Sequence, residues 1–410
     1  MLRIKPFDAL RPAPEHAPRV ASVPYDVVNR EEAAELAAGN PASFLHIVRP
    51  DIDVPEETHP YDDSVYATGK ANFERFQKEG LLVREGQPCI YLYRQMTERA
   101  SQTGVVCCCH IDDYEADIIK KHEKTRKAKE DDRTRHVLTL NANTGPVFLT
   151  YRDHATISEM MASDMAEEPL FDFHAADEVR HTVWRAKNPD SYVHAFGEIP
   201  IAYVADGHHR SASAWRAGKE RRAADPNHST DAEFNWFLAV LFPAGNLTIM
   251  AYNRVIRDLN GLSVEDVLDR LRTMGTVAET ETPYPDQKHA FCFYLGQNRW
   301  YRFDLDRALI DGSDPVKSLD VALLQDRVIE PLFGIEDPRT DERIDFVGGI
   351  RGAAELKRRV DSGKWACAVS IYPTGVDELM RVADAGQIMP PKSTWFEPKL
   401  RSGLLVHTLD

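Results

Sequence analysis

The sequence lacks any run of about 18 apolar residues, so it predicts no transmembrane helix. Its first letters, MLRIKPFDALRPAP, also lack the apolar core of a signal peptide. Cysteine is scarce: six are present and no two are spaced as CxxC, so neither a zinc knuckle nor a disulfide framework is indicated. The three consecutive cysteines, Cys107 to Cys109, are interpreted as small residues of a strand. The cytoplasm is therefore the expected compartment.

Positive charge is also in short supply. The 50 Lys and Arg residues are outnumbered by 65 Asp and Glu residues, which gives a net charge of −15. General nucleic-acid binding needs an excess of cations to neutralise phosphates, so DNA is not an expected partner. Any anion site must be a local basic patch in a negative field.

The length and composition indicate an ordinary globular protein. Of the 410 residues, 43% are hydrophobic and 28% are charged, which allows a large core. This length suggests two or three domains, or one large elaborated one. We expect a first domain over residues 1–260 and a second α+β region over 261–410, although no linker marks the boundary.

Short apolar runs alternate with amphipathic segments along the chain. Strands are predicted at 89–96 and 103–111, and a helix at 62–80. Hairpins are predicted at 234–256, around a Pro-Ala-Gly-Asn turn, and around residues 295–298. Because hairpins outnumber clear crossovers, the sequence predicts an α+β fold with a mixed β-sheet.

The sharpest motif is a polar turn between an apolar strand and a helix. It consists of Asp206, Gly207, His208, His209 and Arg210, and the helix is expected to open at Ser211. A helix start suits an anion, glycine allows close backbone approach, and arginine can hold a phosphate by two hydrogen bonds. Asp206 could hold Mg²⁺ or take a proton, and His209 could assist catalysis. Zinc is not expected, because adjacent histidines point apart and no further ligands are evident.

A charged run at 120–136 is the second motif. It holds eight Lys and Arg residues against four Asp and Glu residues. Most of it is expected to be a solvated, flexible loop, and a mobile lid over phosphates is the alternative. Within it, Glu123 could activate a substrate hydroxyl or ligate a metal, and Arg126 could contact a phosphate.

Two further segments could contribute to a site. The loop at 389–394 offers an ammonium and two hydroxyls after two prolines, from Lys392, Ser393 and Thr394. It could bind a nucleotide or be an ordinary turn. The early turn Pro24-Tyr25-Asp26 adds a carboxylate but indicates little alone.

The ordered motifs IKPFDALRP, ASVPYDVV, NPASFLHIVRP, HEKTR…DDR, ADGHHR, MPPKSTWFEPK and SGLLV resemble the family called domain of unknown function 1015. Some relatives carry a histidine where this chain has Asn253, while Arg254 remains. The strand, DGHHR turn and helix also resemble the phosphate loop of the ParB/sulfiredoxin superfamily, which includes free serine kinases. That resemblance implies a nucleotide-phosphate site at Asp206 to Arg210, and it covers only a short unit of the chain.

Three functions remain open from the sequence alone. The first is a nucleotide-dependent phosphotransferase that uses ATP or ADP with Mg²⁺ and acts on a small hydroxylated metabolite such as a serine-like amino acid. The second is a phosphoester hydrolase with the same anion site. The third is a ParB-like switch, in which nucleotide binding closes a homodimer. The expected partners are a nucleotide and a small-molecule substrate, and no membrane.

Overall fold

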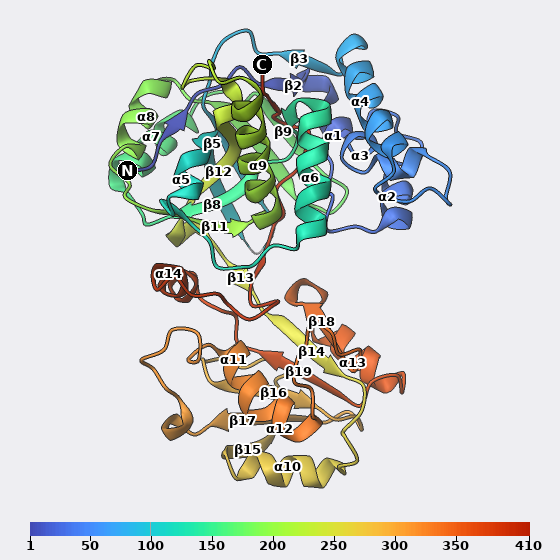
Figure 1. Cartoon of the computed structure of the whole chain (residues 1–410). Helices are drawn as coiled ribbons and strands as arrows, with labels where there is room; N and C mark the ends of the chain where they lie inside the picture. Colours follow the sequence, from blue (N-terminus) through green and yellow to red (C-terminus); the bar gives the residue numbers. More distant parts are fainter. Residues whose placement is uncertain (99) are drawn as a thin grey trace. The chain divides into compact units, whose positions relative to one another are not determined.

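The computed structural model describes residues 1–98 and 100–410 of the chain, which divides into two compact units. The first unit comprises Met1–Leu247 together with Pro398–Asp410, and the second comprises Thr248–Glu397. Each unit is built around its own sheet (Figure 1). None of the helices in the described residues has both the length and the apolar character needed to span a bilayer.

A mixed sheet forms the centre of the first unit, and in the described residues it has nine strands in the order β6-β11-β8-β12-β5-β4-β10-β9, with β1 paired to β5. The pairs β6–β11 and β8–β12 are parallel, and the others are antiparallel. The strands are β1 (Ile4–Lys5), β4 (Tyr91–Met96), β5 (Ser101–His110), β6 (Ile119–Lys120), β8 (Val147–Tyr151), β9 (Phe171–His174), β10 (Arg180–Arg185), β11 (Ala202–Asp206) and β12 (Trp236–Pro243).

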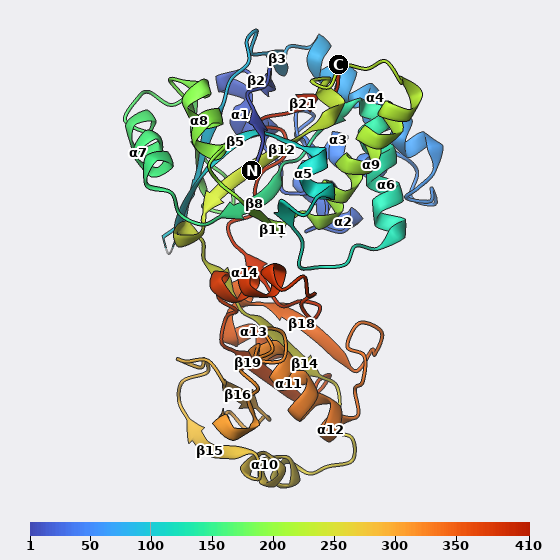
Figure 2. The ribbon, with the colours of Figure 1, turned by 60° about the vertical axis from the view of Figure 1, so that its left-hand side comes forward.

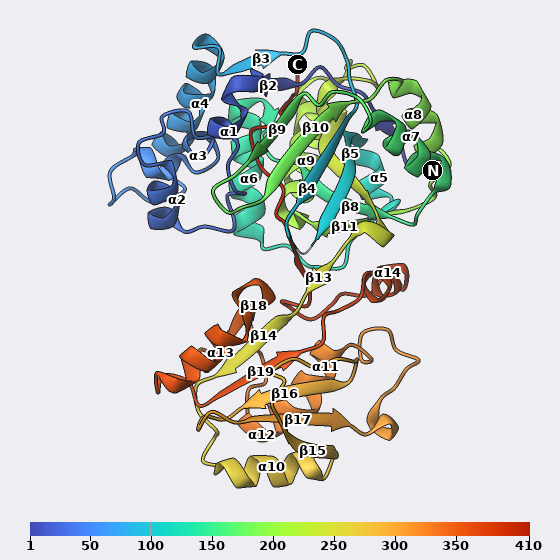
Figure 3. The same ribbon diagram turned by 180° about the vertical axis from the view of Figure 1, so that it is seen from behind.

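Helices and two small strand pairs complete the first unit. The strand pairs are β2 (Leu10–Pro12) with β3 (Leu82–Arg84), and β7 (Ala142–Asn143) with β21 (His407–Thr408). The helices are α1 (Ala17–Val20), α2 (Arg30–Ala37), α3 (Leu45–Val48), α4 (Asp63–Lys78), α5 (Ile111–Glu115), α6 (Lys127–Leu140), α7 (Ala155–Asp164), α8 (Pro189–Phe196) and α9 (His208–Ala224). Figure 3 shows the opposite side of the sheet, with β4 and β10 in front of α9.

The central strands are apolar because both of their faces are covered. The predicted strand over 103–111 is confirmed within β5, where Cys107, Cys108 and Cys109 are all fully buried. Alternate positions of β5 and β12 pack in one cluster with Ala212 and Ala214 of α9. This packing holds the first turns of α9 against the sheet next to the end of β11.

The second unit contains an antiparallel sheet in the order β15-β17-β16-β19-β14-β18 (Figure 2). Its strands are β14 (Tyr252–Ile256), β15 (Gly275–Thr280), β16 (Ala290–Tyr294), β17 (Trp300–Leu305), β18 (Ile344–Gly348) and β19 (Cys367–Ile371), and β13 (Ile249–Met250) pairs with β20 (Trp395–Phe396). Its helices are α10 (Val264–Arg272), α11 (Asp320–Leu324), α12 (Glu330–Phe333), α13 (Gly352–Asp361) and α14 (Val376–Asp384). The predicted hairpin around 295–298 is confirmed by β16 and β17.

The hairpin predicted over 234–256 is wrong. The first of its apolar runs is β12, which pairs with β5 and β8, whereas the second is β14, which pairs with β18 and β19. Each run pairs with strands that are distant in the sequence and belong to a different sheet. The residues of the turn between the two runs do not indicate these pairings. The chain passes from one unit to the other within this turn, between 247 and 248, and not near residue 260 as the sequence analysis expected.

The flexible loop predicted over 120–136 is also wrong for most of its length. Residues from Lys127 onward form α6, which lies beside α9. Arg216 of α9 pairs with Asp131 at 2.7 Å. Asp132 is buried, and the Tyr66 hydroxyl of α4 donates a hydrogen bond to it over 2.8 Å. Tertiary ion pairs and hydrogen bonds therefore order a helix that has little apolar surface of its own.

Candidate functional site

The candidate site begins where β11 ends and α9 starts. The helix begins at His208 and not at Ser211 as the sequence analysis expected, so His208, His209 and Arg210 form its first turn. Gly207 is the N-cap residue and has a φ of 90°. A Cβ added there would lie 3.2 Å from Nε and 3.3 Å from Cζ of Arg210. The glycine therefore serves two needs, since it adopts left-handed backbone and leaves room for the guanidinium to fold over it.

Both carboxylate oxygens of Asp206 accept hydrogen bonds. Its Oδ1 accepts a hydrogen bond from the Gly207 N–H at 2.7 Å, and its Oδ2 accepts one from Lys399 Nζ at 2.9 Å. Burial alone would raise the pKa of Asp206, but Lys399 and Arg210 outweigh burial and hold that pKa well below its usual range. Asp206 is thus a carboxylate at neutral pH and a weak proton acceptor.

Arg210 keeps an unused donor beside this carboxylate. One of its Nη groups donates to the carbonyl of Pro146, while its buried Nε has no hydrogen-bond partner among the described residues. Burial lowers the pKa of Arg210, but the charges of Asp26 and Asp206 more than offset it and leave the pKa raised. The guanidinium is therefore a fixed cation with a donor available for a ligand.

Three side chains form a cluster next to the turn. The rings of His122 and His208 meet edge to face, with centroids 4.5 Å apart. Burial lowers the pKa of His122 to about 3 and that of His208 to about 4, so both rings are neutral at physiological pH. His208 Nδ1 lies 3.6 Å from Oε2 of Glu123, while its buried Nε2 has no hydrogen-bond partner in the described part of the chain.

His209 ties the helix start to the segment before α6. Its Nε2 accepts a hydrogen bond from the backbone N–H of Arg126 at 3.1 Å, so the proton of the neutral ring is on Nδ1. Burial lowers the pKa of His209, and the nearby carboxylates of Asp26 and Glu123 oppose that change. This contact brings the predicted HEKTR segment to the DGHHR turn.

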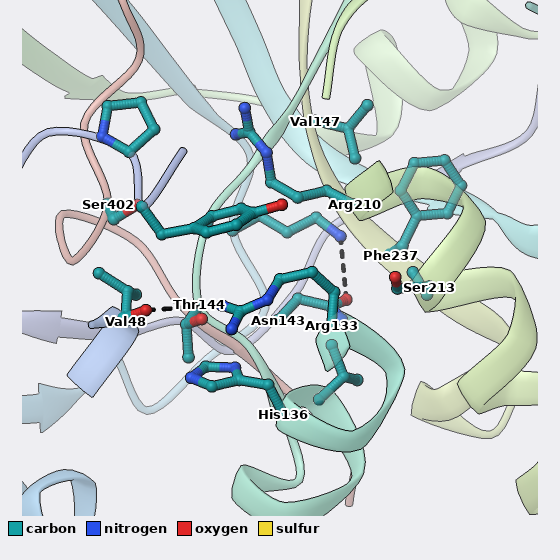
Figure 4. Close-up of a pocket in the computed structure, with 16 residues that line it drawn as sticks. Val48, Arg133, His136, Asn143, Thr144, Val147, Arg210, Ser213, Phe237 and Ser402 are labelled. Carbon is teal, nitrogen blue, oxygen red and sulfur yellow. Dashed lines mark hydrogen bonds between the residues drawn. The ribbon is translucent and has the colours of Figure 1, made fainter. Parts of the chain in front are cut away.

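A small cavity lies behind Arg210, between α6, α9 and the early turn (Figure 4). Its volume is about 40 Å³, and a single water needs roughly 10–15 Å³ measured in this way. Arg133 lies over the ring of Tyr25 at 4.2 Å, and both residues line the cavity with Arg210. The cavity suits a few waters and is too small for a nucleotide.

The structure brings together most of the residues that the sequence singled out. Gly207, His208, His209, Arg210, Asp206, Glu123 and Arg126 all surround one helix start. Ser211 is buried, and its hydroxyl donates to the carbonyl of Gly207, so it supports the helix turn.

The third predicted segment belongs to the second unit. Lys392 Nζ donates to the Tyr252 hydroxyl at 3.3 Å, and the Ser393 hydroxyl donates to the carbonyl of Pro390 at 2.6 Å. The nucleotide contacts expected of Lys392, Ser393 and Thr394 remain predictions.

Sequence reasoning missed three contributors to the site. Lys399 lies seven positions beyond Lys392, in the same motif MPPKSTWFEPK. His122 lies in the charged run that was expected to be solvated, and Asp26 lies in a turn that indicates little alone. One feature of the sequence could have indicated all three residues. Each lies in a segment of charged or aromatic residues that lacks the apolar periodicity of a core helix or strand.

Magnesium was expected at Asp206. No group of three or more His, Cys, Asp or Glu side chains placed to hold a metal occurs in the described residues. Magnesium does not require such a group, because it commonly binds one or two carboxylates together with substrate phosphates. Asp206 already binds Lys399, and its expected contact with magnesium remains a prediction.

Comparison with solved structures finds matches with low sequence identity and low TM-scores. A free serine kinase in complex with AMP has 12% identity and a TM-score of 0.36, with 74% of this chain and 91% of that chain covered. SbnI from Staphylococcus aureus, with a C-terminal truncation, has 12% identity and a TM-score of 0.39, with 73% and 86% covered. A conserved hypothetical protein from Pyrococcus furiosus has 14% identity and a TM-score of 0.35, with 73% and 93% covered.

The search of curated proteins finds no match. At TM-scores below 0.5 the structural likenesses carry no functional argument, which has to come from the side chains above. The family resemblance drawn from the sequence motifs is nevertheless confirmed, because the family model described as "Protein of unknown function (DUF1015)" matches residues 4–322, and the chain therefore belongs to that family.

Proposed function

We propose that the protein is a nucleotide-dependent phosphotransferase that binds phosphate groups at the start of α9. The observation that carries the proposal is the buried Nε of Arg210, a donor that has no hydrogen-bond partner in the described residues. A buried polar atom without a partner costs about 1–3 kcal/mol, which a ligand can recover by supplying the acceptor. Arg210 belongs to the first turn of α9.

The surroundings favour an anion as that ligand. The first N–H groups of α9 have no intrahelical acceptor, and the helix dipole places partial positive charge at the same end. Arg210 adds a full charge, and Lys399 adds another next to Asp206. Gly207 keeps the backbone open to a close approach. Phosphate groups of ATP or ADP satisfy all of these features.

Glu123 is the carboxylate best placed to activate an acceptor hydroxyl. It is partly exposed and lies 3.6 Å from His208, next to the anion site. In the proposed step the hydroxyl oxygen attacks the terminal phosphorus, the bond from that phosphorus to the bridging oxygen breaks, and the hydroxyl proton passes to Glu123. The leaving nucleotide keeps the bridging oxygen and its electron pair. Magnesium, when bound with the nucleotide, would neutralise phosphate charge.

Asp206 takes a different role from the proton acceptor that the sequence suggested. Its low pKa makes it a poor base, and both of its oxygens already accept hydrogen bonds. It fixes Lys399 and the Gly207 turn instead. A small hydroxylated metabolite, such as a serine-like amino acid, remains the proposed acceptor, and the proposal needs no contact from Lys392, Ser393 or Thr394.

The test is phosphoryl transfer by the full chain from Mg-ATP or Mg-ADP to a panel of hydroxylated metabolites. Glu123→Gln should lower the transfer rate about 10²–10⁴-fold and leave nucleotide affinity unchanged, because an amide keeps the shape but accepts no proton. Glu115→Gln is the control, because Glu115 is exposed and pairs with Lys219.

Each other outcome points away from the phosphotransferase. Full transfer by Glu123→Gln would rule out the assigned base. Phosphate release to water without transfer would indicate a hydrolase. Nucleotide binding with neither reaction would favour a ParB-like switch.

A further inference from the structure

Arg254 is a buried cation that has no acidic partner among the described residues. It lies on β14 with 4% of its surface exposed. Its guanidinium donates to two backbone carbonyls, those of Tyr252 and, at 3.2 Å, of Lys392. No carboxylate forms an ion pair with it in the residues that the structure describes.

A buried charge of this kind carries a large desolvation cost. Ions buried in proteins are normally paired, and a buried charge without a partner is strongly destabilising. Burial lowers the pKa of Arg254 to about 9, so the side chain is still protonated at neutral pH. Two carbonyl contacts satisfy some of its donors but supply no negative charge.

A second cation lies in the same neighbourhood. Lys392 has an exposed side chain whose Nζ is 3.3 Å from the Tyr252 hydroxyl and 5.2 Å from the centre of that ring. Its backbone has a φ of 58°, the left-handed region that a lysine rarely adopts. The conformation lets the Lys392 carbonyl accept from Arg254 while its ammonium lies over Tyr252.

Aromatic rings surround the two cations. The Arg254 guanidinium lies 4.6 Å from the ring centre of Phe346 on β18. The rings of Tyr252 and Trp395 meet edge to face with centroids 5.0 Å apart. Trp395 in turn packs against Gly348, where an added Cβ would come within 3.0 Å of the indole. These rings offer an apolar and stackable surface beside the positive charge.

We propose that Arg254 and Lys392 bind the phosphate group of a small aromatic ligand, at a site built from residues of the second unit. Two positive charges match the double negative charge of a phosphate monoester, whereas a carboxylate would leave one charge uncompensated. Arginine can bind such a group by two parallel hydrogen bonds, and lysine adds a point charge. The proposal goes beyond the phosphotransferase site and does not depend on it.

Calorimetric titration of the full chain tests this proposal with three probes: inorganic phosphate, phenyl phosphate and acetate. We expect Arg254→Met to weaken binding of both phosphates at one site at least about tenfold, as expected for loss of hydrogen bonds to a charged group. Lys392→Met should weaken it in the same direction. Arg339→Met is the control, because Arg339 is exposed in the same unit and pairs locally with Asp337. Arg210→Ala should leave this binding intact.

The outcomes separate this site from the one at α9. Unchanged phosphate binding by Arg254→Met, or loss of all phosphate binding in Arg210→Ala, would overturn the proposal. If Arg254→Met does not fold, unchanged binding by the exposed Lys392→Met variant would overturn it instead. Acetate bound as tightly as phosphate would rule out the phosphate assignment, and phenyl phosphate bound no tighter than inorganic phosphate would rule out the aromatic ligand.

Discussion

Lys399 and Asp206 are 193 positions apart in the sequence, and Lys399 Nζ lies 2.9 Å from Asp206 Oδ2. The C-terminal segment that carries this lysine is fixed by two glutamines of the large sheet. Gln95 donates to the carbonyl of Lys399 at 2.8 Å, and Gln102 donates to that of Pro398 at 3.0 Å. The ammonium group of Lys399 therefore offsets the negative charge of Asp206 in the DGHHR turn.

Lys399→Met should destabilise the folded protein by about 1.5–3 kcal/mol at neutral pH, the range for a hydrogen bond to a charged group. The pKa of Asp206 is lowered in the folded state, so its contribution is present above the unfolded value of 3.8 and is lost as pH falls towards the folded value. The stabilities of wild type and variant should thus differ most above about pH 5 and draw together only as pH falls below 3.8 towards the folded pKa of Asp206.

Urea unfolding at a series of pH values measures this difference. The control is Lys219→Met, whose exposed pair with Glu115 should contribute at most about 1 kcal/mol. A gap between wild type and Lys399→Met that stays constant down to low pH would contradict a charge interaction with Asp206.

Gly207→Ala should weaken phosphate binding as well as stability. Its φ of 90° strains any other residue, and the new Cβ would displace the Arg210 guanidinium from 3.2 Å. A positive φ costs an alanine about 1–2 kcal/mol. Gly80→Ala is a matched control, since Gly80 has a φ of 73° and nothing within 4 Å of an added Cβ.

Both glycine variants should therefore lose stability in thermal unfolding. Calorimetry with ADP should show weaker binding for Gly207→Ala alone. Equal binding by the two variants would mean that Arg210 is not held in place by Gly207.

His122→Phe should make the protein less sensitive to acid. Burial lowers the pKa of His122 from 6.5 to about 3, so the unfolded state binds more protons between these values and stability falls as pH falls. Removing the imidazole should reduce that slope by about 1.4 kcal/mol per pH unit between roughly pH 6 and pH 4. Denaturant unfolding over this range is the measurement, with His194→Phe as an exposed control. The same slope in both variants would refute a buried neutral His122.

Local patterns predicted the strand, turn and helix at DGHHR because one short segment contains the residues that form them. An apolar strand, a glycine turn and a helix are needed in that order, and residues 201–216 carry them in that order. The same approach recovered the β16–β17 hairpin and the helix α4.

Long-range relationships could not be predicted in this way. The sequence shows nothing that would send β12 and β14 to different sheets, because both segments have the pattern of strands on either side of one turn. The helix α6 depends on Arg216 and Tyr66, which lie on other helices. The contact of Lys399 with Asp206 was missed for the same reason, since two lysines in one motif differ only in which residues the fold brings to them.

Calorimetric titration of the full chain with ADP, in the presence of magnesium, tests the central claim most directly. Arg210→Ala should weaken ADP binding by about 1.5–3 kcal/mol, because it removes the guanidinium whose Nε has no partner in the described residues. Arg339→Ala removes an exposed arginine of the second unit and should bind as wild type does. Absence of ADP binding by the wild-type chain, or equal binding by Arg210→Ala and Arg339→Ala, would contradict a nucleotide-phosphate site at the start of α9.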